Sequence, residues 1–123
     1  MRLKNKIAII TGAASGFGKG IAKKFSEEGA KSILVDINKD LLEKVSKDLN
    51  QDFLHTDVAN SNSMKQLADY VLKKYESIDI MVNNAGITHL PKPLEEVSEE
   101  EFDKTFAVNS KSVFLCGKFF VPH

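Results

Sequence analysis

The chain has 123 residues, enough for one domain of ordinary size, and 42% of them are hydrophobic, so the composition favours a folded domain over a disordered chain. Seventeen basic residues balance seventeen acidic ones, which argues against a general attraction to nucleic acid or to an anionic membrane. There is neither an apolar run of about 18 residues nor the apolar segment of a signal peptide, and the lone cysteine, Cys116, fits a reducing compartment, so a cytoplasmic protein is expected.

Short apolar runs alternate with amphipathic segments along the chain. The first run, 6–11, precedes a segment with Phe17, Ile21 and Phe25 at four-residue spacing, which predicts a helix over 16–28 that stops at Gly29. Nearly continuous runs rich in β-branched residues are typical of parallel strands covered on both faces. The further predicted elements are strands at 32–37, 52–58 and 78–82, and helices at 39–49 and 63–75.

A loop over 88–93 follows the fourth strand, and a helix is then predicted to start at Ser98. Glu101 stands three residues further on, so the two can form a capping box, and the acidic run 99–101 would lie at the positive end of the helix dipole. Helical character is expected to resume near Ser110 and to continue to Phe120.

The regular alternation of strands and helices predicts right-handed crossovers and a doubly wound parallel sheet. The expected strand order is 3-2-1-4, which is a Rossmann-type α/β fold. Because the pattern stops before a fifth strand, residues 1–123 are expected to form a single domain that is incomplete at its C-terminal end.

Three glycines, Gly12, Gly16 and Gly18, lie between the first strand and the first helix. A glycine-rich turn at a helix N-terminus exposes backbone N–H groups that bind a pyrophosphate. Gly12 suits the tight turn, Gly16 lets a ligand approach the backbone, and Gly18 lets the helix pack closely. The spacing fits neither a phosphate-binding P-loop nor the common G-x-G-x-x-G pattern, so a tight turn without a ligand remains the alternative.

Asp36 ends the second strand, where a carboxylate can accept hydrogen bonds from the ribose hydroxyls of a dinucleotide. Its alternative role is to cap the next helix, which Asn38 could do equally well. A carboxylate at this position would repel a 2′-phosphate, so the cofactor is predicted to be NAD rather than NADP.

Four motifs together resemble the short-chain dehydrogenase/reductase family: T-G-x-x-x-G-x-G at 11–18, Asp36, the pair Asp57 and Val58, and N-N-A-G at 83–86. The similarity extends over the whole chain and implies an NAD(P)-binding domain. It also implies roles for residues that match the motifs. Those implied to contact the cofactor are Ser15, Gly16 and Phe17 in the turn, Asp57 and Val58 beside the adenine, and Asn84, Ala85 and Gly86 behind the cofactor.

Asn109 matches the family's catalytic asparagine, whose main-chain carbonyl holds a water in a proton relay. Asparagine is unfavourable in the middle of a helix, so a kink or a water site is expected here. No metal site is expected, because His55 and His123 are interpreted as structural and His89 in the loop has no evident partner.

The family's chemistry also needs a tyrosine, a lysine four residues later and a serine, in chains about twice this length. Tyr70 and Lys74 have the Y-x-x-x-K spacing, but they precede the N-N-A-G motif and are interpreted as an exposed pair on one helix face. Two functions therefore stay open. One is an NAD-dependent oxidoreductase of an alcohol or ketone, and the other is a non-catalytic NAD-binding or interaction module; self-association, or pairing with a complementing C-terminal half, is expected in both cases.

Overall fold

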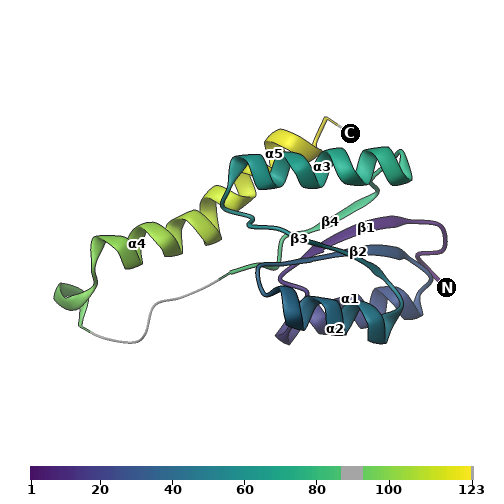
Figure 1. Cartoon of the computed structure of the whole chain (residues 1–123), viewed down its shortest axis with the longest axis horizontal. Helices are drawn as coiled ribbons and strands as arrows, with labels where there is room; N and C mark the ends of the chain where they lie inside the picture. Colours follow the sequence, from purple (N-terminus) through teal and green to yellow (C-terminus); the bar gives the residue numbers. More distant parts are fainter. Residues whose placement is uncertain (87–92, 123) are drawn as a thin grey trace.

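The computed structural model describes residues 1–86 and 93–122, which form a four-stranded sheet with helices on both faces (Figure 1). The elements in chain order are β1 (Ile7–Thr11), α1 (Gly16–Glu27), β2 (Lys31–Asp36), α2 (Lys39–Leu49), β3 (Asp52–His55), α3 (Ser61–Tyr75), β4 (Ile80–Val82), a 3₁₀ turn (Leu94–Glu96), α4 (Glu99–Phe106), a π-helical segment (Ala107–Lys111) and α5 (Ser112–Phe120).

All neighbouring strands of the sheet are parallel, and their order is β3-β2-β1-β4. The predicted Rossmann-type fold and strand order are thus confirmed. β1 lies inside the sheet between β2 and β4, and every one of its residues is buried. Since parallel strands all end at the same edge, the turns that follow β1, β2, β3 and β4 are brought together there.

Two hydrophobic clusters hold the layers together, one on each face of the sheet. Helices α1 and α2 cover one face, and α3 and α5 cover the other (Figure 1). Successive residues of β1 point to opposite faces, so Ile9 packs with the α3 and α5 cluster and Ile10 with the α1 and α2 cluster. Burial on both faces is why the strands appear in the sequence as continuous apolar runs.

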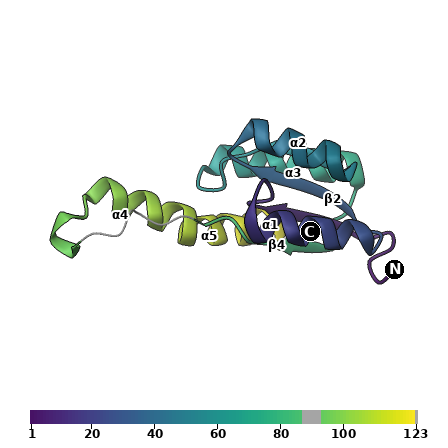
Figure 2. The ribbon, with the colours of Figure 1, turned by 90° about the horizontal axis from the view of Figure 1, so that it is seen from below.

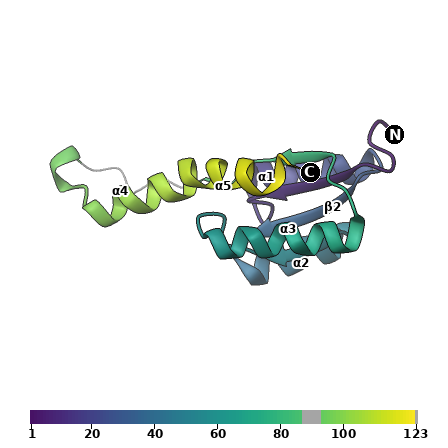
Figure 3. The same ribbon diagram turned by 90° about the horizontal axis from the view of Figure 1, so that it is seen from above.

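Helix α4 extends away from the body of the molecule, as Figures 2 and 3 show from opposite sides. None of its residues is buried. Ser98 caps this helix as predicted, because the Glu101 N–H donates to Ser98 Oγ over 3.1 Å, and that hydroxyl also donates to the Glu101 carboxylate over 3.3 Å.

The expected break before Ser110 is wrong, because helical structure runs without interruption from Glu99 to Phe120. The irregularity predicted at Asn109 takes the form of a π-helical segment, Ala107–Lys111. A π turn accommodates an additional residue without ending the helix, so the unfavourable asparagine alters the helix locally instead of breaking it.

Two strands, β3 and β4, are shorter than predicted by two residues or more. β3 ends at His55 rather than at residue 58, because the Asp57 carboxylate accepts a hydrogen bond from the Ala59 N–H (3.0 Å) and turns the chain away from the sheet. β4 covers only Ile80–Val82 rather than 78–82.

Cys116 is buried on α5 in the cluster between α3, α5 and the sheet. Burial raises the pKa of its thiol, and a hydrogen bond with the Asn83 side chain lowers it by a smaller amount. Cys116 therefore packs as a small buried residue, and a thiol with a raised pKa is a poor nucleophile at neutral pH.

Candidate functional site

A cavity of about 460 Å³ opens at the carboxyl edge of the sheet, where the turns after the four strands meet. Its lining includes most of the residues that the sequence marked for cofactor binding: Gly12, Ser15, Phe17, Asp36, Asp57, Val58, Asn84, Ala85 and Gly86. Four more lining residues were missed by the sequence analysis: Ile37, Thr56, Lys104 and Val108. Gly16 and Gly18 are not among the lining residues, although both neighbours of Gly16 are.

The glycine turn has the backbone shape that the sequence predicted. Gly12 and Gly16 have φ angles of +65° and +58°, a region that residues with side chains rarely adopt. A Cβ added to Gly16 would meet no atom within 4 Å, so this backbone faces open space. Ser15 is the N-cap of α1 and its side chain makes no capping hydrogen bond. An open backbone at the positive end of a helix fits a pyrophosphate.

Gly18 serves packing. A Cβ added to it would lie only 2.0 Å from the carbonyl oxygen of Gly12, which no structure tolerates. Close contact between the first turn of α1 and the glycine turn therefore requires glycine here, as the sequence analysis expected of this position.

Thr11, at the end of β1, joins the glycine turn to the turn after β4. Its Oγ1 donates to the Val82 carbonyl (3.2 Å) and accepts from the N–H groups of Asn84 and Ala85 (3.0 Å each). The Asn84 amide also donates to the Gly12 carbonyl over 3.3 Å. Thr11 is a polar residue at the end of an otherwise apolar strand, and this pattern is the sequence signal for its role.

The Asp36 carboxylate lies between the glycine turn and the start of α2. One oxygen accepts from the Ala14 N–H over 3.0 Å and the other from the Asn38 N–H over 2.9 Å. The capping of α2 is done by Asn38, whose side chain accepts from the Leu41 N–H over 3.2 Å. The capping alternative for Asp36 is thus wrong, and its carboxylate lines the cavity.

Asn109 lies in the π segment and is not a lining residue, whereas its neighbour Val108 is. Its side chain nonetheless faces the cavity wall, because its Oδ1 would lie 3.3 Å from a Cβ added at Gly86. A side chain at Gly86 would require this asparagine to shift by a few tenths of an ångström. The π-helical segment and the turn after β4 therefore meet at these two residues.

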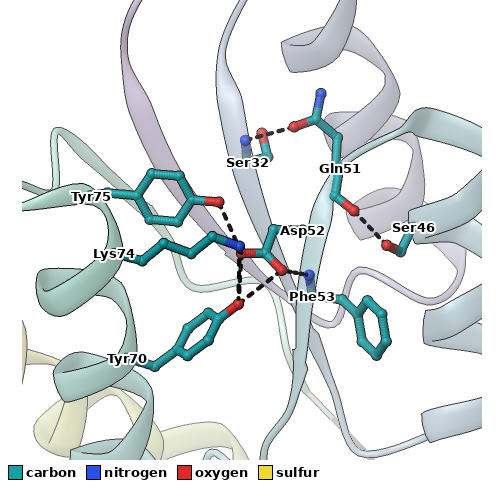
Figure 4. Close-up of polar contacts among 8 residues, drawn as sticks. All are labelled: Ser32, Ser46, Gln51, Asp52, Phe53, Tyr70, Lys74 and Tyr75. Atoms are coloured by element: carbon teal, nitrogen blue, oxygen red, sulfur yellow. Dashed lines mark hydrogen bonds and ion pairs between the residues drawn. The ribbon is translucent and has the colours of Figure 1, made fainter.

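Tyr70 and Lys74 do not reach the cavity. Their side chains converge with that of Tyr75 on Asp52, the first residue of β3 (Figure 4). Both tyrosine hydroxyls donate to Asp52 Oδ2 over 2.8 Å, and Lys74 Nζ lies 2.9 Å from the same oxygen. The prediction that Tyr70 and Lys74 form an exposed pair is therefore wrong in part. The helix directs both side chains to the Asp52 carboxylate, at the edge of the sheet opposite to the cavity.

Competing influences act on the Asp52 carboxylate. Partial burial raises its pKa, but the hydrogen bonds from Lys74, Tyr70 and Tyr75 outweigh burial, so the pKa lies below the ordinary value. Burial and then the bond to Asp52 raise the pKa of Tyr75 to about 12. Because the Asp52 pKa is depressed by folding, its contribution to stability is complete above the unfolded pKa of about 3.9 and is lost as the pH falls through the lower, folded value.

Asp52→Asn is expected to lower the free energy of unfolding by about 1–2 kcal/mol at pH 7, because three hydrogen bonds lose their charged acceptor. Urea denaturation at pH 7 and at about pH 3 would measure this. The difference from the wild type should shrink in acid, where the wild-type carboxylate also becomes protonated. A difference that grows on acidification would contradict the assignment.

Residues 1–86 and 93–122 show no candidate for a metal site or for a membrane-spanning helix. No three His, Cys, Asp or Glu side chains of these ranges come together in a way that could hold a metal ion. Within the same ranges, no helix combines the length and apolar character needed to cross a bilayer. His55 Nε2 lies 2.8 Å from the Ile37 carbonyl oxygen, a structural contact as expected, while His89 and His123 lie outside the described residues.

A parallel sheet in this order, with a glycine turn and an acidic residue beside one cavity at its carboxyl edge, is the arrangement of a Rossmann-type α/β domain. The family model described as short chain dehydrogenase matches residues 6–123. The chain belongs to the short-chain dehydrogenase/reductase family.

Two sequence relatives and a solved structure agree with this assignment. An uncharacterised oxidoreductase of Bacillus subtilis is 40% identical over 98% of the chain and 46% of its own length, and zerumbone synthase of Zingiber zerumbet is 42% identical over 94% and 45%. A solved 3-ketoacyl-(acyl-carrier-protein) reductase from Brucella melitensis, complexed with NADH, superposes with a TM-score of 0.95 at 39% identity, covering 98% of this chain and 50% of its own. The chain spans about half the length of the curated relatives it matches.

Proposed function

We propose that this chain is the cofactor-binding domain of an NAD-dependent oxidoreductase that acts on an alcohol or ketone. The observation that carries the proposal is the hydrogen bond between the Ala14 N–H and the Asp36 carboxylate, because it holds the glycine turn and a ribose-binding acid together at one cavity. Family membership and the NADH and NAD complexes of similar structures support the same function.

Each side of the cavity has a distinct binding role in this proposal. The backbone at Ser15, Gly16 and Phe17 binds the pyrophosphate, and Asp36 accepts hydrogen bonds from the adenosine ribose. Asp57 and Val58 border the adenine. Asn84, Ala85 and Gly86 form the wall behind the cofactor, which Thr11 ties to the glycine turn.

When bound, the nicotinamide supplies or accepts the hydride. Asn109 is assigned to the proton path, where its main-chain carbonyl would hold a water. The π segment supports this role, because a π turn disturbs the regular helical hydrogen bonding of its carbonyl groups. The Asn109 side chain against Gly86 positions this part of the helix beside the cofactor wall.

The second candidate function is an NAD-binding module without catalysis. It is favoured by the position of Tyr70 and Lys74, whose side chains bind Asp52 at the edge opposite to the cavity. NADH titration together with an assay of turnover on alcohols and ketones separates the two functions. We expect the 123-residue chain to bind NADH without turnover; turnover that disappears in Tyr70→Phe would contradict this placement of the tyrosine.

Asp36→Asn is expected to weaken the preference for NADH over NADPH. The carboxylate repels the 2′-phosphate by roughly 1–4 kcal/mol at ~4 Å separation, and asparagine removes this charge while keeping an acceptor oxygen. Calorimetric titration with both cofactors would give the ratio of the NADPH to the NADH dissociation constant, which should fall by about fivefold or more.

Asp36→Ala is the matched comparison, because it also deprives the Ala14 N–H of its acceptor. It should weaken the binding of both cofactors, whereas Asp36→Asn should mainly change their ratio. Equal affinities for NADH and NADPH in the wild type would refute the proposed preference.

We also propose that the 123-residue chain self-associates. Phe102, Phe106, Val113 and Phe114 are each more than half exposed, and β4 has no strand on its outer side among the described residues. Unpaired strand edges and contiguous apolar side chains both promote association. Sedimentation at micromolar concentration should show dimers or larger species, and a sharp monomer would refute the proposal.

A further inference from the structure

Three charged side chains line the cavity among the described residues: Asp36, Asp57 and Lys104. Two of them are carboxylates, which repel an anionic ligand. The glycine turn offers only the partial charge of a helix N-terminus, equivalent to roughly half an elementary charge. In the described part of the chain, Lys104 is therefore the one lining residue that carries a full positive charge.

Lys104 reaches the cavity from α4, a helix that otherwise lies away from the body of the molecule (Figures 2 and 3). Val108 also lines the cavity, and the four-residue spacing places the two side chains on one side of the helix. Phe102 and Phe106 are largely exposed, and their rings stack 6.2 Å apart. The side of the helix with Lys104 is thus the side that closes the cavity.

The ion pairs found among the described residues join Lys24 to Glu28 and Lys74 to Asp52. Neither of these ion pairs involves the Lys104 ammonium. The ammonium is on a long, flexible stem at an open rim. A dinucleotide in the cavity would bring two negative charges on its pyrophosphate next to two carboxylates. A nearby cation would offset that repulsion directly.

We propose that Lys104 is a further cofactor-binding residue, whose ammonium attracts and contacts the anionic dinucleotide from the α4 side of the cavity. This inference rests on the proposed function, since it assigns a second side to the same cofactor site. None of the motifs in the sequence points to Lys104, because its role comes only from the position of α4 against the turns after β2, β3 and β4.

The test is a fluorescence titration of NADH with the full chain as wild type, Lys104→Gln, Lys104→Glu and Lys104→Arg, at about 0.02 M and about 0.5 M salt. At low salt, Lys104→Gln should raise the Kd about two- to fivefold, the range of an exposed charge pair, and Lys104→Glu should raise it further. Lys104→Arg should bind like the wild type. At high salt these differences should largely disappear, because screening shortens the range of the interaction.

Lys118→Gln is the matched control, because it removes the same charge from α5 at a residue that does not line the cavity. It should bind NADH like the wild type. If wild-type affinity persists in Lys104→Gln and Lys104→Glu, or if Lys118→Gln is equally weakened, the inference is overturned while the proposed function stands. If the wild type itself does not bind NADH, the proposed function fails and the inference fails with it.

Discussion

Gly16→Val is expected to abolish NADH binding. The Cβ of residue 16 would project into open space between two residues that line the cavity, where the pyrophosphate is proposed to approach the backbone. A branched side chain there would occupy that space and hold the ligand away from the N–H groups at the start of α1. Because contacts with the glycine turn supply much of the proposed binding, fluorescence titration should detect no saturable binding at millimolar NADH.

Backbone strain has to be separated from loss of space for the ligand. Residue 16 has a φ of +58°, so any side chain there costs about 1–2 kcal/mol of stability. Gly16→Ala carries the same kind of strain with far less volume. Urea denaturation of both variants, combined with NADH titration, compares the two effects. If Gly16→Val remains folded and binds NADH as tightly as the wild type, the pyrophosphate does not lie on this backbone.

Gly18→Ala is expected to be among the most destabilising single substitutions in the chain. The added Cβ would lie 2.0 Å from the Gly12 carbonyl oxygen and 2.6 Å from the Asn84 side-chain nitrogen, so α1 would have to move away from the turn. Overpacking of this kind costs about 3 kcal/mol or more, a large part of a total stability of roughly 5–15 kcal/mol. Thermal denaturation should show a fall in Tm of more than about 10 °C.

Gly20→Ala is the control for a methyl group added to the same helix. A Cβ at residue 20 meets nothing within 4 Å, and alanine has a higher helix propensity than glycine, so this variant should be as stable as the wild type or more stable by about 0.5–1 kcal/mol. A Tm for Gly18→Ala that matches the Gly20→Ala value would show that α1 does not need its close contact with the glycine turn.

The sequence by itself determined most of the elements and the order of the strands in the sheet. Hydrophobic periodicity depends on residues that are neighbours along the chain, so it predicted α1, α2 and α3 within two residues at either end. Capping is equally local, and the predicted roles of Ser98 and Asn38 are confirmed. The positions of Gly12 and Asp36 at strand ends also follow from local pattern, because parallel strands place their carboxyl ends at one edge.

The tertiary structure alone decided which further residues face the cavity and what Tyr70 and Lys74 contact. Thr56 lies in the turn after β3 and Lys104 lies in α4, and nothing in their neighbouring residues indicates that the fold brings them to one cavity. Tyr70 meets Asp52 across 18 positions of sequence, although its spacing of four residues to Lys74 is equally compatible with an isolated pair on one helix face. Side-chain partners of this kind depend on how a helix is rotated against the sheet. That rotation is set by the packing of the whole domain, and the local sequence pattern does not determine it.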